Sequence, residues 1–252
     1  MAILATDKLE KKFGGIHAVN KLSISFEAGR ITGIIGPNGS GKSTLINTLT
    51  GLLPMNGGHV IIGGEHGERL SEIDSHEVPS LGMTRTFQDV RLFEQMPVLD
   101  NILVALTKRS IWSSLFEKHS KLHVERAEEV LKKVGLWEKR TELAKNLSYG
   151  QRKLVEIARM LAMIHSGAGD IQVIFFDEPY AGLFPEMLKI VETVMRELRD
   201  QGRAVVLVEH NMDLIRSLSD YLYVLDAGQL LAEGKPDEVL ARKEVVEAYL
   251  GE

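Results

Sequence analysis

Residues 31–44 read ITGIIGPNGSGKST, an apolar run that leads into a glycine-rich turn ending in a lysine. The turn fits the pattern G-x-x-x-x-G-K-S/T, whose fixed positions are Gly36, Gly41, Lys42 and Ser43. The run before the turn predicts a strand, and TLINTLTGL after it has the apolar spacing of a helix. Because backbone N–H groups and a helix N-terminus converge on such a loop, the stretch predicts a phosphate-binding site. The competing interpretation is a glycine-rich turn with an incidental lysine.

The residue types of this loop predict how it would bind a nucleotide. Glycines permit the positive φ angles and the close backbone approach that an anion requires. The ammonium of Lys42 would neutralise the β- and γ-phosphates, and the hydroxyl of Ser43 would ligate Mg²⁺. The residues of this loop expected to bind the nucleotide phosphates are Gly36, Pro37, Asn38, Gly39, Ser40, Gly41, Lys42, Ser43 and Thr44.

A second motif places two acids after an apolar run. Residues 173–179 read VIFFDEP, so Asp177 and Glu178 would lie at the carboxyl end of a buried strand, where open α/β folds bind their ligands. We expect Asp177 to hold Mg²⁺, directly or through water, and Glu178 to polarise the attacking water as general base. Two such acids can instead cap the next helix, and the phosphate loop favours the catalytic interpretation.

Apolar patterns around these motifs predict an α/β fold with a mostly parallel sheet buried on both faces. The spacing is helical from about Pro97 to His165 and alternates between strands and helices after that. Strands are expected at residues 22–26, 30–36, 59–63, 83–87, 173–176, 204–208 and 221–225, and helices near 185–200 and 211–218. One helical face is expected to contain Val124, Ala127, Leu131 and Val134.

Composition excludes several classes of protein. The 252 residues are 44% hydrophobic and 26% charged, which is typical of globular domains. This composition argues against a disordered or fibrous chain. The net charge of −5 gives no attraction to nucleic acid or anionic lipid, and the absence of cysteine excludes disulfides and thiolate metal sites. The first residues predict no signal peptide, and no apolar run approaches the about 20 residues of a membrane span. Any membrane role would therefore be peripheral.

The order of the motifs resembles that of one family. Residues 147–151 read LSYGQ, which is similar to the LSGGQ signature of ATP-binding-cassette (ABC) ATPases. The phosphate loop, a strand ending near Gln88, a helical segment, LSYGQ, VIFFDEP and His210 in VVLVEHN follow one another as in that family, over nearly the whole chain. A regulatory GTPase or a kinase would lack LSYGQ followed by DEP and the late histidine.

This resemblance implies the P-loop NTPase fold of the ABC cassette. The expected α/β fold has a mixed or parallel core sheet, an N-terminal antiparallel β subdomain and an inserted α-helical subdomain. Residues 1–252 would form a single ABC ATPase domain. Its ATP-binding core would contain about residues 1–90 and 166–252, and its helical signature subdomain about residues 91–165.

The resemblance also implies roles for single residues. Phe13 in KKFGG is similar to the aromatic residue that stacks on adenine, with a core position as the competing interpretation. Gln88 resembles the glutamine that reaches Mg²⁺ and the attacking water. His210 resembles the histidine that contacts the γ-phosphate, although a histidine at a strand end is often structural.

The signature motif implies a partner subunit. In the family, the helix N-terminus at this motif faces the γ-phosphate bound to the opposite subunit. The residues of this chain at that position are Ser148, Gly150 and Gln151. Two chains, identical or paralogous, would therefore enclose two ATP molecules in a twofold dimer. Tyr149 replaces the usual glycine and Phe184 replaces a polar residue in AGLFP, which puts dimer closure and communication between the two sites in question.

Several stretches of the sequence resemble the ATPase subunits of branched-chain amino-acid importers and their urea and amide relatives. They are KKFGGIHAVN at 11–20, RTFQDVRLFEQMPVLDNILVA at 85–105, NLSYGQ at 146–151 and the terminal EAYLGE. The implied protein is an Mg²⁺-dependent ATPase at the cytoplasmic face of the inner membrane. Its partners would be transmembrane permease subunits, a second ATPase subunit and, indirectly, a solute-binding protein, with no nucleic acid.

Two alternatives to this function stay open. The first is a soluble cassette ATPase that acts on DNA or ribosomes, although such proteins usually carry coiled coils, two cassettes or basic surfaces. The second is a catalytically silent nucleotide-binding module, which the presence of both Glu178 and His210 disfavours.

Other patterns are ambiguous. Residues 91–96 would receive a coupling helix from the permease or belong to the subdomain core. His119 and His123 have helical spacing, but no third metal ligand is evident. Trp112 and Phe116 are core residues or permease contacts, and HSGAGD at 165–170 predicts a surface loop of unknown role.

Overall fold

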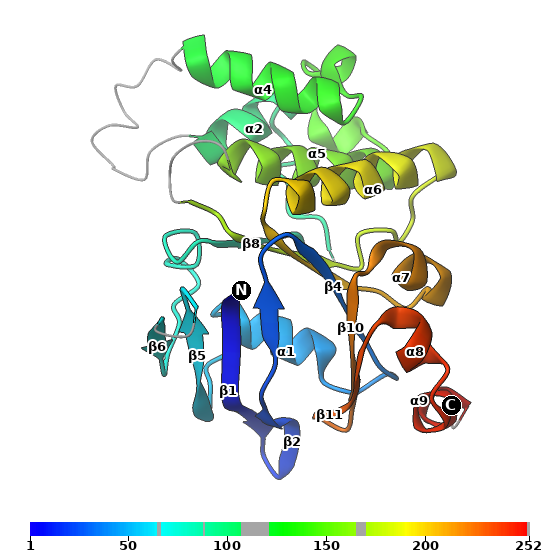
Figure 1. Ribbon diagram of the computed structural model, residues 1–252. Coiled ribbons are helices and arrows are strands. Elements are labelled where there is room, and N and C mark those ends of the chain that lie inside the picture. The colour runs from blue at the N-terminus through cyan, green and yellow to red at the C-terminus, as the bar shows by residue number, and fades with distance from the viewer. Residues whose placement is uncertain (65–66, 88, 107–120, 165–169, 251–252) are drawn as a thin grey trace. The chain divides into compact units, whose positions relative to one another are not determined.

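The computed structural model describes residues 1–64, 67–87, 89–106, 121–164 and 170–250 (Figure 1). They divide into two compact units, and the chain passes from the first to the second between Arg85 and Thr86. The first unit contains Met1–Arg85, Ile171–Glu178 and Val194–Glu252. The second unit contains Thr86–Asp170 and Pro179–Thr193.

One sheet of the first unit is antiparallel. Its strand order is β2-β1-β5-β6, with β3 also paired to β1. This confirms the antiparallel β structure near the N-terminus that the family resemblance implies. The strands are β1 (Ala2–Phe13), β2 (Ile16–Leu22), β3 (Ser25–Glu27), β5 (Gly57–Ile62) and β6 (Glu68–Leu70).

The prediction of one strand over residues 22–26 is wrong, because β2 ends at Leu22 and β3 begins at Ser25. The hydroxyl of Thr6 explains the break. It donates a hydrogen bond to the Leu22 carbonyl oxygen at 2.9 Å and accepts one from the Ile24 N–H at 3.0 Å. A buried side chain thus takes up backbone groups that a continuous strand would use.

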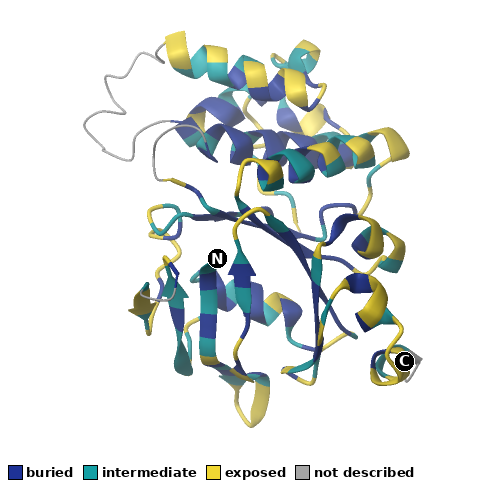
Figure 2. Ribbon diagram, viewed as in Figure 1, coloured by how far each residue is buried: buried dark blue, intermediate teal, exposed yellow. Residues whose placement is uncertain are grey.

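The second sheet of the first unit has the order β11-β10-β4-β9-β8-β7. All neighbours are parallel except β11, which is antiparallel to β10. Every residue of β8 and β9 is buried, as expected for central parallel strands (Figure 2). The predicted α/β fold is confirmed, while β11 had no prediction. The strands are β4 (Arg30–Ile35), β7 (Met83–Arg85), β8 (Val173–Asp177), β9 (Ala204–Val208), β10 (Tyr221–Asp226) and β11 (Gln229–Gly234).

Aromatic packing and helices complete the first unit. Phe26 packs edge-to-face on both Phe175 and Tyr223, with ring centroids 6.2 Å apart in each pair. The side-chain oxygen of Asn211 caps a helix by accepting from the N–H groups of Asp213 and Leu214. The helices are α1 (Lys42–Leu49), α7 (Met212–Leu218), α8 (Pro236–Leu240), α9 (Lys243–Leu250) and the end of α6 (Pro185–Asp200).

The second unit is helical. Of the four residues predicted to share one helical face, Ala127 and Leu131 are buried in the helix over Lys121–Lys133, and Val124 is half-buried there. Val134 is buried but follows the end of this helix. The buried amide of Asn101 fixes the preceding turn by accepting from the Phe93 N–H and donating to backbone carbonyls. Among the described residues, no helix is both long and apolar enough to cross a bilayer. The elements are α2 (Val98–Leu106), α4 (Lys121–Lys133), η1 (Trp137–Lys139), η2 (Ala144–Asn146), α5 (Tyr149–Ile164) and the first part of α6.

Candidate active site

The glycine-rich loop connects β4 to α1 in the first unit, with strand before and helix after it as predicted. Gly36 and Gly41 have φ angles of 155° and 101°. A Cβ atom on Gly36 would lie 2.1 Å from the Leu225 carbonyl oxygen, and one on Gly41 would lie 2.2 Å from the Ala18 carbonyl oxygen. Both positions therefore accept only glycine, for conformational and steric reasons.

Lys42 lies over this loop with its side chain buried. Its Nζ donates to the carbonyl oxygens of Gly36 at 2.7 Å and Pro37 at 2.9 Å and to the hydroxyl of Ser40 at 3.3 Å. The first turn of α1 contains no acidic residue. An ammonium and the positive end of a helix dipole therefore act on the same loop, an arrangement that favours an anion.

The other residues predicted in the loop have mixed exposure. Asn38, Gly39 and Ser43 are exposed, and Thr44 is half-buried. Ser43 presents its hydroxyl on the first turn of α1, and Asp177 is a buried carboxylate at the end of β8. Both side chains offer the oxygen ligands that Mg²⁺ prefers, and both belong to the first unit. This pair of donors fits the predicted metal.

Glu178 and His210 lie together. Nε2 of His210 is 2.8 Å from Oε1 of Glu178, in a hydrogen bond that the imidazole N–H donates to the carboxylate. The backbone of Glu178 has a φ angle of 46°, which is uncommon outside glycine, and its N–H donates to the Val208 carbonyl oxygen at 3.0 Å. Asp177 and Val208 are register partners in β8 and β9. The parallel pairing of these strands thus brings together side chains that are 32 residues apart in the chain.

Phe13 is exposed at the end of β1, so the interpretation as a core residue is wrong. The ammonium of Lys11 lies 5.1 Å from its ring centroid, in a cation–π contact. An exposed ring is compatible with adenine stacking, which stays a prediction.

The signature residues begin α5 in the second unit. The Ser148 N–H donates to Oε1 of Gln151 at 3.1 Å, and the Gln151 N–H donates to the Ser148 hydroxyl at 3.3 Å. This reciprocal pair is a capping box, which the spacing S-x-x-Q could have predicted. A Cβ atom on Gly150 would lie 2.8 Å from the Met187 sulfur, so this glycine permits close packing on α6. Ser148 is exposed and Gln151 is half-buried.

The two departures from the family pattern, Tyr149 and Phe184, are both exposed in this unit. The ring of Tyr149 covers Gly182, where a Cβ atom would lie 2.8 Å from the tyrosine Cδ1. Lys153 Nζ lies 5.6 Å from the centroid of the same ring. Tyr149 therefore packs against the AGLFP segment of its own chain.

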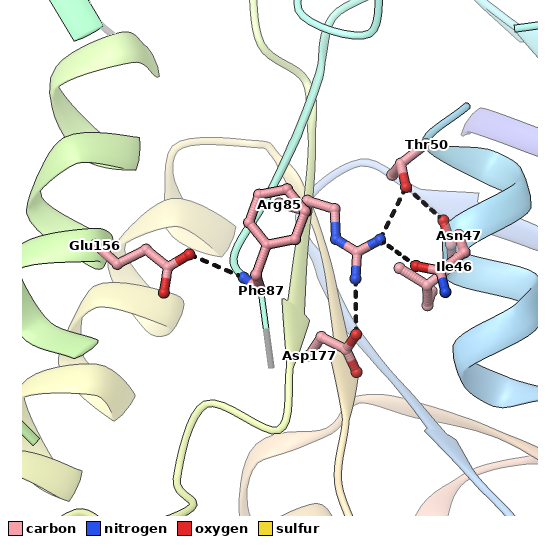
Figure 3. A network of polar contacts seen from close by, with 7 residues as sticks. All are labelled: Ile46, Asn47, Thr50, Arg85, Phe87, Glu156 and Asp177. Carbon is pink, nitrogen blue, oxygen red and sulfur yellow. Dashed lines mark hydrogen bonds and ion pairs between the residues drawn. The ribbon is translucent and has the colours of Figure 1, made fainter. Parts of the chain in front are cut away.

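Sequence reasoning missed two charged residues, Arg85, whose side chain is largely buried, and Glu156, which is buried (Figure 3). In the first unit, Nη2 of Arg85 donates to Oδ2 of Asp177 at 2.8 Å. In the second unit, Oε1 of Glu156 accepts from the Phe87 N–H at 3.1 Å. Burial raises the pKa of Glu156 to about 7, although the Phe87 N–H and nearby cations act in the opposite direction.

Some predicted residues lie outside the described part of the chain. They include Gln88, His119, Trp112, Phe116 and most of the 165–170 loop. His123 is half-buried on α4, and the predictions for the other residues stay untested.

A parallel sheet with a glycine-rich loop after β4 and paired acids after β8 defines the class of P-loop nucleotide-binding proteins. Residues 19–181 match the family model described as ABC transporter, and residues 229–252 match one described as branched-chain amino acid ATP-binding cassette transporter. The chain therefore belongs to the ABC transporter family and is an ABC ATPase, which confirms the family resemblance.

Individual relatives agree with this membership. The high-affinity branched-chain amino acid transport ATP-binding protein LivG of Salmonella typhimurium is 36% identical, over 99% of this chain and 98% of that protein. A crystal structure of a nucleotide-free ATP-binding cassette from an ABC transporter is 36% identical, with a TM-score of 0.84 and complete coverage of both chains. A structure of the ADP conformation of such a cassette is 35% identical, again with complete coverage, and has a TM-score of 0.82.

Proposed function

We propose that the chain is the ATP-hydrolysing subunit of an importer for branched-chain amino acids or related amide and urea-type solutes. Similarity over nearly the whole chain to a LivG protein supports the solute class, and so does the match over residues 229–252. The observation that carries the proposal is the arrangement in the first unit. There a phosphate-binding loop and the hydrogen-bonded pair Glu178 and His210 follow strands of one parallel sheet.

In the proposed site, the loop over residues 36–44 binds the triphosphate, and Phe13 stacks on adenine. Lys42 exchanges its bonds to loop oxygens for bonds to the β- and γ-phosphates. Ser43, Gln88 and Asp177 would hold Mg²⁺, which when bound neutralises charge on the same phosphates.

Hydrolysis would use the acid at the end of β8. Glu178 takes a proton from the water that attacks the γ-phosphorus, which makes the water a stronger nucleophile. His210 donates to the same carboxylate at 2.8 Å and would reorient toward the γ-phosphate when nucleotide binds. The bond between the γ-phosphorus and the oxygen that bridges it to the β-phosphate then breaks. ADP keeps that oxygen, and ADP and phosphate leave the site.

The proposed enzyme acts as a dimer of ATPase subunits, with an identical or a paralogous second chain. Ser148, Gly150 and Gln151 of one subunit would complete the γ-phosphate site of the other. About residues 91–165 would form the signature subdomain. Its exposed Phe93 and Met96 would contact a transmembrane permease at the cytoplasmic face of the inner membrane.

The partner prediction has a direct test. Affinity purification of the tagged chain from solubilised membranes should recover membrane-spanning subunits, and cells with the complete transporter should accumulate radiolabelled leucine. Lys42→Ala should abolish that uptake, because phosphate binding loses its main cation. Arg199→Lys, a change in an ion pair on α6, serves as the control. Recovery with ribosomes or DNA instead of membrane subunits would favour the soluble alternative.

A further inference from the structure

Strand register explains how Arg85 comes to face the acid of the candidate metal site. Arg85 ends β7 and is the register partner of Phe175 in the parallel strand β8. Side chains two residues apart on a strand point to the same face, so Asp177 follows Phe175 on that face. The basic side chain at the end of one strand therefore lies beside the acidic side chain at the end of the next.

The guanidinium of Arg85 joins three side chains of the first unit (Figure 3). Nη2 donates to Oδ2 of Asp177 at 2.8 Å, while Nη1 donates to Oδ1 of Asn47 at 2.7 Å and to the Thr50 hydroxyl at 3.0 Å. The side chains of Arg85 and Asp177 are only 8% and 4% exposed, so solvent screens this ion pair weakly. The planar fork of arginine makes the three bonds possible, because its nitrogens point in fixed directions.

Of the two partners near α1, Asn47 lies within the helix and Thr50 is its C-cap residue, and both lie on the side that also carries Ser43. Asn47 follows Ser43 by four residues and Thr50 follows Asn47 by three, and these spacings place residues on one side of a helix. The Thr50 hydroxyl is itself held, since it donates to the Ile46 carbonyl oxygen at 2.7 Å. The guanidinium thus connects this face of α1 to the carboxylate at the end of β8.

We propose that Arg85 is a positioning residue that fixes the Asp177 carboxylate relative to α1, and so pre-arranges the oxygen ligands for a Mg²⁺–nucleotide complex. The inference rests on the proposed function of the site. A carboxylate has two oxygens and about four lone-pair directions, so a hydrogen bond to Oδ2 is compatible with metal binding by the same group. The positive charge of Arg85 repels a cation, and any gain in Mg²⁺ affinity must therefore come from orientation.

The variant Arg85→Lys separates orientation from charge, because it keeps the positive charge and removes the fork. We expect the Mg²⁺ concentration for half-maximal ATPase activity to rise about tenfold and kcat to fall about tenfold, at the low end of effects of residues that orient metal ligands. The second readout is binding of a fluorescent ADP analogue. Its affinity in EDTA should stay within about twofold of wild type, while the gain in affinity on adding Mg²⁺ should shrink about tenfold.

Asn47→Ala provides a second variant that leaves the Arg85–Asp177 pair in place, and it should change the same quantities by about threefold. Arg199→Lys is the matched control and should behave as wild type. Wild-type Mg²⁺ dependence in both Arg85→Lys and Asn47→Ala would overturn the inference, as would an equal loss of ADP affinity with and without Mg²⁺. A wild-type chain that hydrolyses no ATP would instead contradict the proposed function.

Discussion

Arg85 in the first unit and Glu156 in the second both have largely buried charged side chains, but these charges are compensated differently. Arg85 donates to an ionised partner, Asp177, and to two neutral oxygens. Glu156 accepts a hydrogen bond from the backbone N–H of Phe87, while Arg159, Lys153 and Arg91 lower its pKa through space. Burial outweighs these contributions and raises the pKa of Glu156 to about 7.

This difference shows that the partner of a buried charged group decides how the group responds to pH. An ion pair keeps its charges over a wide pH range, because each charge stabilises the other. Glu156 instead has the backbone N–H dipole of Phe87 as its hydrogen-bond partner, and its pKa of about 7 lies close to physiological pH. The protonation state of Glu156 should therefore change with pH near neutrality.

The largest effect on the free energy of unfolding is expected from breaking the ion pair between Arg85 and Asp177. Arg85→Met leaves the Asp177 carboxylate buried without its cation and should lower the free energy of unfolding by about 3–5 kcal/mol. Urea denaturation measures this change. Arg85→Met combined with Asp177→Leu should recover part of the loss, because no charge is then buried. A double variant less stable than Arg85→Met would show that the two residues do not act as a pair.

A smaller effect is expected at Glu156. Its pKa rises from an ordinary 4.5 to about 7 on folding, so the native chain binds a proton that the unfolded chain has already lost. The stability from this proton is complete below about pH 4.5 and is lost as the pH rises through about 7. Glu156→Gln cannot titrate. Its stability relative to wild type should therefore increase by about 3 kcal/mol between about pH 4 and pH 8.

Denaturation of wild type and Glu156→Gln at several pH values checks this prediction. Glu128→Gln on α4 is the control, since its carboxylate is partly exposed in an ion pair with Lys132. A stability difference between wild type and Glu156→Gln that does not vary with pH would contradict the assignment of this titration to Glu156.

The smallest effect is expected for Glu128 itself. Its ion pair with Lys132 has an N–O distance of 2.7 Å, shorter than the 2.8 Å of the Arg85–Asp177 pair. Solvent screens the exposed pair, so Glu128→Gln at pH 7 should change the free energy of unfolding by less than about 0.5 kcal/mol. A loss as large as that of Arg85→Met would mean that burial does not distinguish the two pairs.

Local patterns were sufficient to predict the glycine loop, the acids at the end of β8 and the helix after Asn211, because each depends on neighbouring residues. Arg85 and Glu156 gave no such signal. Their hydrogen-bond partners Asp177 and Phe87 are 92 and 69 residues away, and their burial depends on the folded sheet and helices. The break before β3 was missed for a similar reason, since it depends on the Thr6 hydroxyl 16 residues earlier.

Turnover by Glu178→Gln tests the catalytic site most directly. The amide keeps the shape of the carboxylate but cannot take a proton from water, so steady-state ATP hydrolysis should fall by about 10²–10⁴-fold. Binding of ATP to the same variant should match wild type, because the phosphate loop is unchanged. Hydrolysis at the wild-type rate by folded Glu178→Gln would contradict the account, and so would a loss of ATP binding as complete as the loss of turnover.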